Sequence, residues 1–148
     1  MGEKDYNAPM HSAEHILNGT MDKLFNCGRA FSSHVERKKS KCDYHFERPL
    51  REEELQQLEN KVNEVIAQHF EVTEDFISRD EAEKLFNFSR LPESAGEMLR
   101  IIRIGDYDAC PCIGMHVQNT SEIGKFKIIS SDYKEGVLRI RFKREDNN

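Results

Sequence analysis

The stretch Val137-Leu138-Arg139-Ile140-Arg141-Phe142-Lys143, close to the end of the chain, alternates basic and apolar side chains. Successive side chains of a β-strand point to opposite faces of its sheet, so this strand has one apolar face and one charged face, with a single shift at Val137. Phe126–Ser130 is a second strand candidate, and Lys134-Glu135-Gly136 between the two suits a hairpin turn. These residues predict an antiparallel sheet with one face in water.

Two amphipathic helices are expected before this hairpin. Residues 8–26 carry apolar side chains at helical spacing, and these form one broad stripe: Met10, Ala13, Ile16, Leu17, Met21, Leu24 and Phe25. His11 and His15 fall together just beside this stripe. The second helix opens at Pro49 with acidic residues close behind, as the helix dipole favours, and continues to about residue 69.

Shorter elements fill the rest of the chain. They are expected at 30–36, 42–47, Phe70–Ser78 and Met98–Ile104 (strands), within Arg79–Phe88 (a short helix) and at Gly105–His116 (an irregular loop). Helices mixed with mostly antiparallel strands, without a βαβ rhythm, predict the α+β class. We expect a mostly antiparallel sheet with two main helices packed on it, in a single domain over residues 1–148.

The composition suits a very soluble domain. The chain has 148 residues, 37% of them hydrophobic and 33% charged, with a net charge of −5. No apolar run approaches the roughly 20 residues that span a bilayer, and the first residues lack the apolar stretch of a signal peptide. We therefore expect a cytoplasmic protein without membrane contact. Because the chain is acidic, a nucleic-acid partner requires local basic patches.

Two short motifs contain the side chains that favour zinc. His11-Ser12-Ala13-Glu14-His15 places two imidazoles one helical turn apart on the same face, so both can reach one ion. Cys112-Ile113-Gly114-Met115-His116 adds a thiolate and an imidazole from a loop about 100 residues later. Neither motif is specific alone. Together they predict a roughly tetrahedral zinc site at His11, His15, Cys112 and His116.

The other cysteines do not form a competing metal set. Cys110 and Cys112 could be a redox pair, but Cys-Pro-Cys gives poor disulfide geometry. Cys110 therefore stays open as a group beside the ligands or as an alternative ligand. Cys27 and Cys42 are most simply core or surface residues.

The most specific sequence segment in the chain is His116-Val117-Gln118-Asn119-Thr120-Ser121-Glu122-Ile123-Gly124-Lys125-Phe126-Lys127-Ile128. With the two ligand motifs it resembles the editing domain of alanyl-tRNA synthetase and the freestanding AlaX proteins and, more distantly, threonyl-tRNA synthetase. Arg103–Asp108, Ser32–Val35 and Pro49-Leu50 are also similar, so the resemblance covers nearly the whole chain. The larger enzymes carry Gly-Gly-Thr where this chain has Ile113-Gly114-Met115, and a Thr that senses the substrate hydroxyl in some relatives falls near Ala30.

The resemblance implies a zinc-dependent hydrolase that removes serine, and as a second substrate glycine, from wrongly charged tRNA(Ala). His11, His15 and Cys112 are then the zinc ligands, and His116 is a fourth ligand or a proton-transfer group. Small polar groups near the zinc are expected to recognise the serine hydroxyl, and the candidates are Ser32, Ser33 and Thr120. The tRNA acceptor end is expected to contact basic residues, with Lys38, Lys39, Lys125 and Arg141 as candidates. A monomer and a homodimer both stay open.

Two other classes of function stay open as well. His11-x-x-Glu14-His15 matches the H-x-x-E-H motif of some metalloproteases, in which the Glu is the general base, although these use a distant carboxylate as third ligand. Glu14 is therefore either a catalytic candidate or a solvated helix residue. A non-catalytic module that zinc stabilises and that binds tRNA or protein is the second alternative. A closed four-ligand shell favours the module, and three ligands plus water favour the enzyme.

Overall fold

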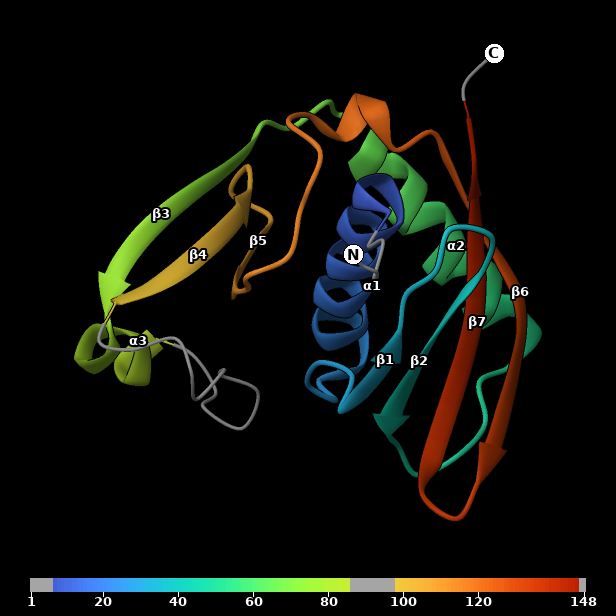
Figure 1. Ribbon diagram of the computed structural model, residues 1–148. Helices are drawn as coiled ribbons and strands as arrows, with labels where there is room; N and C mark the ends of the chain where they lie inside the picture. Colours follow the sequence, from blue (N-terminus) through green and yellow to red (C-terminus); the bar gives the residue numbers. More distant parts are fainter. Residues whose placement is uncertain (1–6, 86–97, 147–148) are drawn as a thin grey trace.

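Helix α1 (Ala8–Phe25) lies between two antiparallel sheets (Figure 1). The computed structural model of the chain describes residues 7–85 and 98–146. The larger sheet has the order β1 (Ser32–His34), β2 (Ser40–His45), β7 (Val137–Glu145), β6 (Lys125–Lys134). The smaller has the order β3 (Val72–Ser78), β4 (Met98–Ile104), β5 (Asp108–Pro111). Helices α2 (Glu52–Ala67) and α3 (Arg79–Leu85) and the 3-10 turn η3 (Thr120–Glu122) complete a small α+β domain, which confirms the predicted class.

The larger sheet contains the predicted hairpin. Leu138, Ile140 and Phe142 of β7 are fully buried, whereas the arginines that alternate with them are only partly covered. Glu135 and Gly136 have φ values of 49° and 85°, the left-handed pair that a tight two-residue hairpin turn requires. β6 is longer than the predicted Phe126–Ser130, and a bulge between Ile128 and Ser130 shifts its register against β7.

Helix α1 is buried along most of its length because it is covered from two sides. Asn7 caps its start, with the side-chain oxygen accepting from the Met10 N–H at 3.0 Å. Every residue from Met10 to Met21 is buried. The apolar residues of the stripe share one core with β7 and with Leu58, Val62, Val65 and Ile66 of α2. The polar residues beside the stripe, including both histidines, face the smaller sheet and the chain that follows it.

The smaller sheet corrects one prediction. The segment Gly105–His116 was expected to be irregular, but it contains β5, which pairs with β4 through Cys110 opposite Ile102. The four residues Asp-Ala-Cys-Pro have little intrinsic strand preference, so the pairing with β4 decides their conformation. After Pro111 the chain leaves the sheet and crosses to α1. Within the described part of the chain, no helix is both long and apolar enough to cross a membrane.

Candidate metal centre and its cavity

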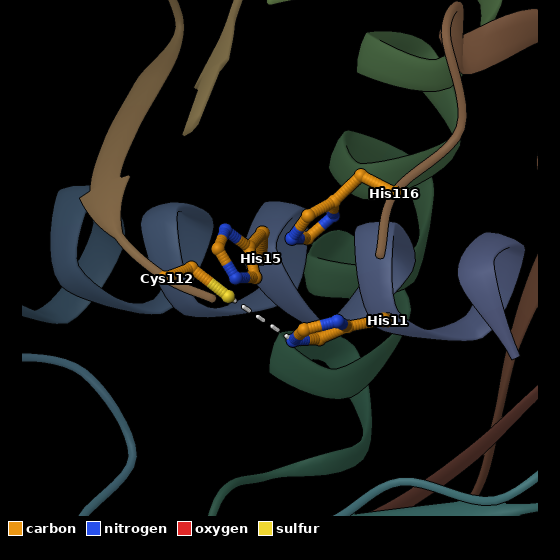
Figure 2. Close-up of side chains that lie close together, drawn as sticks. All are labelled: His11, His15, Cys112 and His116. Carbon is orange, nitrogen blue, oxygen red and sulfur yellow. Dashed lines mark hydrogen bonds between the residues drawn. The ribbon is translucent and has the colours of Figure 1, made fainter. Parts of the chain in front are cut away.

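The four predicted ligands converge on one point between α1 and the loop after β5 (Figure 2). One ligand atom from each of His11, His15, Cys112 and His116 lies within 4.8 Å of the others. The Cys112 sulfur is 3.6 Å from His11 Nε2. Zinc binds sulfur at about 2.3 Å and imidazole nitrogen at about 2.0–2.1 Å, so small adjustments of these side chains would bring all four atoms within reach of a single ion.

Hydrogen bonds orient two of the imidazoles. His11 Nδ1 lies 3.2 Å from the carbonyl oxygen of Met115, which can only accept, so Nδ1 carries the proton and the lone pair of Nε2 faces Cys112. His116 Nδ1 lies 2.9 Å from Ser12 Oγ, and the same hydroxyl accepts the Val117 N–H at 3.1 Å. Partners of this kind on the outer ring nitrogen fix the orientation of metal-binding histidines in general.

The chemistry of these donors fits zinc. His116 Nε2 is buried and makes no hydrogen bond to any group that the structure describes, and such an atom costs free energy unless something binds it. Burial, aided by the nearby His11, lowers the pKa of His116 to about 3, so its ring is neutral at pH 7, as a metal ligand must be. Burial raises the pKa of the Cys112 thiol, and a bound cation reverses this effect. Neutral imidazole nitrogens and a thiolate are both zinc ligands, so this set of donors fits the ion.

The ligand loop approaches α1 closely because it contains a glycine. A Cβ atom on Gly114 would lie 2.3 Å from Cε1 of His11, a distance that real contacts do not reach. Arg100 of β4 holds this loop: its Nη1 donates to the carbonyl oxygens of Cys112 at 3.2 Å and Gly114 at 2.7 Å. The predicted C-x-x-x-H spacing is therefore combined with a steric requirement for glycine.

A cavity of about 110 Å³ adjoins the ligands. It is lined by three of them, His11, His15 and Cys112, and by Glu14, Asn18, Arg29, Cys110 and Pro111. A larger and more open groove, between α2 and β6, contains none of the candidate ligands. The metalloprotease alternative requires a distant carboxylate as third ligand, whereas in the described part of the chain a cysteine and a third histidine join the helix pair.

Glu14 lines this cavity and is not a solvated helix residue. Only 6% of its surface is exposed. One carboxylate oxygen, Oε2, accepts hydrogen bonds from Asn18 Nδ2 at 2.8 Å and Ser33 Oγ at 3.0 Å. The other, Oε1, lies 3.7 Å from His11 Nε2. The solvated alternative was wrong because strand β1 and the loop after β5 cover the side of α1 that its own apolar stripe leaves open.

Arg29 of the cavity lining forms an ion pair with Asp108 that the sequence did not suggest. Arg29 donates to both carboxylate oxygens of Asp108, at 2.8 and 3.2 Å. Asp108 in turn lies 4.0 Å from His15 Nδ1. A Cβ atom on Gly19 would be 2.7 Å from the Asp108 carboxylate, so this glycine lets β5 approach the helix. The partners are 79 positions apart in loop and strand segments without periodicity, so only the Gly within a helical pattern was a usable signal.

Cys110 is beside the ligands but outside their cluster. Its sulfur lies 3.4 Å from the Pro111 carbonyl oxygen, and burial raises its pKa to about 11, so it stays a neutral thiol. None of the four cysteines forms a disulfide.

The structure separates the three predicted substrate residues. Ser33 contacts Glu14 directly, and Ser32 is exposed on β1. Thr120 does not line the cavity. Its fully buried hydroxyl donates to the Ile66 carbonyl at 3.0 Å and accepts the Phe70 N–H at 2.9 Å, which ties η3 to the end of α2. With both hydrogen bonds made, Thr120 is a structural residue, and its assignment as a substrate residue is corrected.

The predicted tRNA-binding residues differ in their exposure and in their distance from the cavity. Lys38, Lys39 and Lys125 are exposed. Arg141 lies on the solvent face of the larger sheet, where it donates to Asp132 at 2.6 Å. That face is opposite to the one that packs on α1, so the sheet separates Arg141 from the cavity.

The chain is similar to part of known aminoacyl-tRNA synthetases. Residues 99–141 match the family model described as the threonyl and alanyl tRNA synthetase second additional domain. The chain is 35% identical over 138 residues to the alanine–tRNA ligase of Aeropyrum pernix and 36% identical over 132 residues to that of Fervidobacterium nodosum. It is 32% identical over 147 residues to the alanine–tRNA ligase of Bdellovibrio bacteriovorus.

These similarities cover 89%, 88% and 98% of this chain but only 15%, 15% and 16% of the relatives. The chain therefore spans about one sixth of the length of the ligases that it matches. The predicted resemblance is confirmed: the chain is homologous to a domain-sized segment of alanyl-tRNA synthetases, as an AlaX-like editing domain is.

Proposed function

We propose that this chain is a zinc-dependent hydrolase that removes serine from wrongly charged tRNA(Ala), with Gly-tRNA(Ala) as a second substrate. The observation that carries the proposal is the convergence of four zinc-type ligand atoms within 4.8 Å beside a cavity of about 110 Å³. The similarity to alanine–tRNA ligases supports tRNA(Ala) as the carrier. In the reaction, water cleaves the ester between the amino acid and the terminal ribose, giving free amino acid and uncharged tRNA.

The convergence of the four side chains and the family resemblance support the proposed metal-binding roles. His11, His15 and Cys112 hold the zinc, and His116 either completes the set or transfers a proton, since its Nε2 is directed into the same cluster. Zinc in such a site supplies Lewis-acid chemistry, either by polarising an ester carbonyl or by lowering the pKa of a water toward about 7. Ser12 keeps the His116 ring in place through the contact at Nδ1.

Recognition of serine uses the polar wall of the cavity. Of the predicted residues, Ser33 is the nearest to the cavity, because its hydroxyl contacts Glu14, and Ser32 directly precedes it on the same strand. A synthetase pocket for alanine excludes serine poorly, because an added hydroxyl is hard to reject sterically. A second site that binds the hydroxyl removes the error, because alanine would leave its polar groups unpaired at a cost of about 1–3 kcal/mol.

The acceptor end of the tRNA contacts Lys38, Lys39 and Lys125, which are exposed. Arg141 contributes least, since its charge is already paired with Asp132. Binding through these residues weakens as salt rises, because phosphate contacts release counterions.

The non-catalytic module is the second candidate, and one observation favours it: the cluster offers four ligands and could close around the ion without a position for water. The cavity with Glu14, Asn18 and Arg29 in its wall favours the enzyme, because a purely structural site needs no polar space beside it.

The deciding experiment is a deacylation time course on matched Ser-tRNA(Ala) and Ala-tRNA(Ala), with and without chelator. We expect hydrolysis of Ser-tRNA(Ala) to be about 5- to 150-fold faster, the ratio that corresponds to one unpaired buried polar group. Cys112→Ala should abolish this activity, whereas Cys27→Ala, the same change at a half-buried cysteine outside the cluster, should retain it. Equal rates on the two substrates would remove the specificity, and full activity of Cys112→Ala would remove the zinc mechanism.

A further inference from the structure

We propose that Glu14 binds the protonated α-amino group of the substrate, so that the site accepts α-amino esters and discriminates against esters that lack the amine. This inference rests on the proposed function, since it assigns the part of the cavity that receives the amino acid.

The carboxylate is held in one orientation. Asn18 and Ser33, on α1 and β1, both donate to Oε2, at 2.8 and 3.0 Å. Asn18 is itself fixed, because its amide oxygen accepts from the hydroxyl of Tyr44 at 2.7 Å and from the backbone N–H of Ala30 at 3.2 Å. Oε1 is left on the ligand side of the carboxylate, 3.7 Å from His11 Nε2. Glu14 thus offers one fixed acceptor atom beside the metal centre.

The donors to Glu14 are neutral. In the described ranges, no lysine or arginine forms an ion pair with this carboxylate, and its ion-pair contact is with His11. Since Nδ1 of His11 donates to the Met115 carbonyl, the Nε2 lone pair belongs to the metal cluster and cannot supply a proton to Glu14 at the same time. A carboxylate that is 6% exposed is costly to bury without a direct ion pair, and the nearby Arg29 directs its hydrogen bonds to Asp108. A cationic group of the substrate offsets this cost.

Glu14 is also the anion that is available in the cavity. Asp108 is the second acid near the cluster, but both of its oxygens accept from Arg29. A zinc ion with one thiolate and neutral imidazoles keeps one positive charge, which repels an ammonium group. Glu14 brings the sum to zero, so the cavity can admit an α-amino group, which is substantially protonated at pH 7. The cavity of about 110 Å³ has Glu14 in its lining, so it offers space for a small amino-acid group beside this carboxylate.

The rival role for Glu14 is that of a proton acceptor for water, as in the H-x-x-E-H motif. The two roles differ in their dependence on the substrate. A proton acceptor serves every ester equally, whereas an ammonium ligand matters only when the amine is present.

The experiment is a cycle of protein variants against two non-cleavable probes. One probe is adenosine with L-serine in an amide link at the 3′ position, and the other carries L-glyceric acid, which has a hydroxyl in place of the amine. Dissociation constants are measured by calorimetry on zinc-loaded protein at pH 6.5, and the zinc content of every variant is determined. Glu14→Gln keeps the size of the side chain and removes its charge. Glu59→Gln, the same change at a carboxylate that accepts the Ile128 N–H outside the cavity, is the matched control.

We expect Glu14→Gln to weaken binding of the seryl probe about 10- to 100-fold, the range for a hydrogen bond between charged groups, and to change binding of the glyceryl probe by less than about twofold. Glu59→Gln should leave both constants unchanged. Ser33→Ala, which removes one of the two donors that orient Glu14, should weaken the seryl probe about threefold to tenfold more than the glyceryl probe. The glyceryl probe keeps the side-chain hydroxyl of serine, so it reports any direct contact of Ser33 with that group, and the difference between the probes keeps the test decisive if Glu14→Gln fails to fold.

An equal loss on both probes, or no loss on either, overturns the role of Glu14 while the wild-type protein still hydrolyses Ser-tRNA(Ala). A wild-type protein that binds neither probe and hydrolyses no aminoacyl ester overturns the proposed function, and this inference with it.

Discussion

The two faces of α1 are buried to the same degree but for different reasons. Toward the four-stranded sheet the helix presents Ala13, Ile16 and Leu17, each with no exposed surface, in one core with β7. Toward the three-stranded sheet it presents His11, Ser12 and His15, which are also buried. Burial of the apolar face is favourable by itself, whereas each polar atom on the other face costs free energy until it is bound. The apolar face therefore stabilises the fold, whereas a ligand bound at the polar face would offset the cost of burying it.

The largest effect is expected on the apolar side. Phe142 is fully buried in β7 against Phe126, with ring centroids 5.4 Å apart, and Phe142→Ala should lower the free energy of unfolding by about 3–5 kcal/mol. Denaturant unfolding with and without zinc measures this loss. Because Phe142 lies on the apolar side of α1, away from the metal centre, we expect the same loss of stability with and without zinc. Ile129→Ala, on an exposed side chain of β6, is the control and should change stability by less than about 1 kcal/mol.

On the polar side, Gly114→Ala should act on zinc and not on the fold. The new methyl group would collide with the His11 ring, so we expect zinc affinity to fall about 10- to 100-fold, as when a group that orients a ligand is removed. Competition with a chromogenic chelator measures it. Gly136→Ala is the matched control: nothing lies near its Cβ position, but φ is +85°, so it should cost about 1 kcal/mol of stability and leave zinc affinity unchanged. A stable Gly114→Ala protein with normal zinc affinity would contradict the steric argument.

A smaller loss is expected from Ser12→Ala. This change removes the partner of both His116 Nδ1 and the Val117 N–H, so the ring loses its orientation. We expect zinc affinity to fall about 10-fold, together with about 1–2 kcal/mol of stability from the unsatisfied N–H. The same competition assay and a melting curve record the two effects. If stability falls while zinc affinity is unchanged, Ser12 supports the fold and not the metal centre.

The smallest effect is expected on the outer face of the larger sheet. Arg141→Ala breaks an exposed pair with Asp132, which should cost less than about 1 kcal/mol of stability. Deacylation and zinc affinity should stay within about twofold of wild type. Lys38→Ala combined with Lys39→Ala should instead weaken tRNA binding and reduce its salt dependence by about one unit per phosphate contact. A larger loss of tRNA binding in Arg141→Ala than in the double lysine variant would place the tRNA on the sheet.

The sequence predicted the elements that local periodicity encodes. The alternation at Leu138, Ile140 and Phe142 located the core face of β7, and the spacing of apolar residues located α1 within one residue at its end. Strand β5 was missed because its pairing partner β4, and not its own four residues, makes it a strand. Helical periodicity likewise shows where one apolar stripe lies, but not that a second layer covers the opposite side.

The candidate site could likewise be predicted only in part, because local patterns do not show which residues are brought together. The ligand cluster could be predicted because metal ligands have characteristic spacings within each motif, and two motifs together are specific. Glu14 was placed as a possible solvated residue and Thr120 near the metal, since neither burial nor the direction of a hydroxyl is encoded locally. The pair of Arg29 and Asp108 depends on contacts between residues 79 positions apart, which a single sequence does not reveal.

The proposed coordination of one ion by α1 and the ligand loop also has a consequence for chain entropy. His11 and Cys112 are 101 positions apart, so an ion shared by them closes a loop that contains most of the chain. In the polymer model of cross-links, tying a loop of about 100 residues removes freedom from the unfolded chain worth about 4–5 kcal/mol. The ion would then act as a reversible cross-link. When it is removed, we expect hydrogen exchange of the backbone amides to become faster in β5 than in β7. The cross-link joins the end of β5 to α1, whereas β7 is already held by the hydrophobic core.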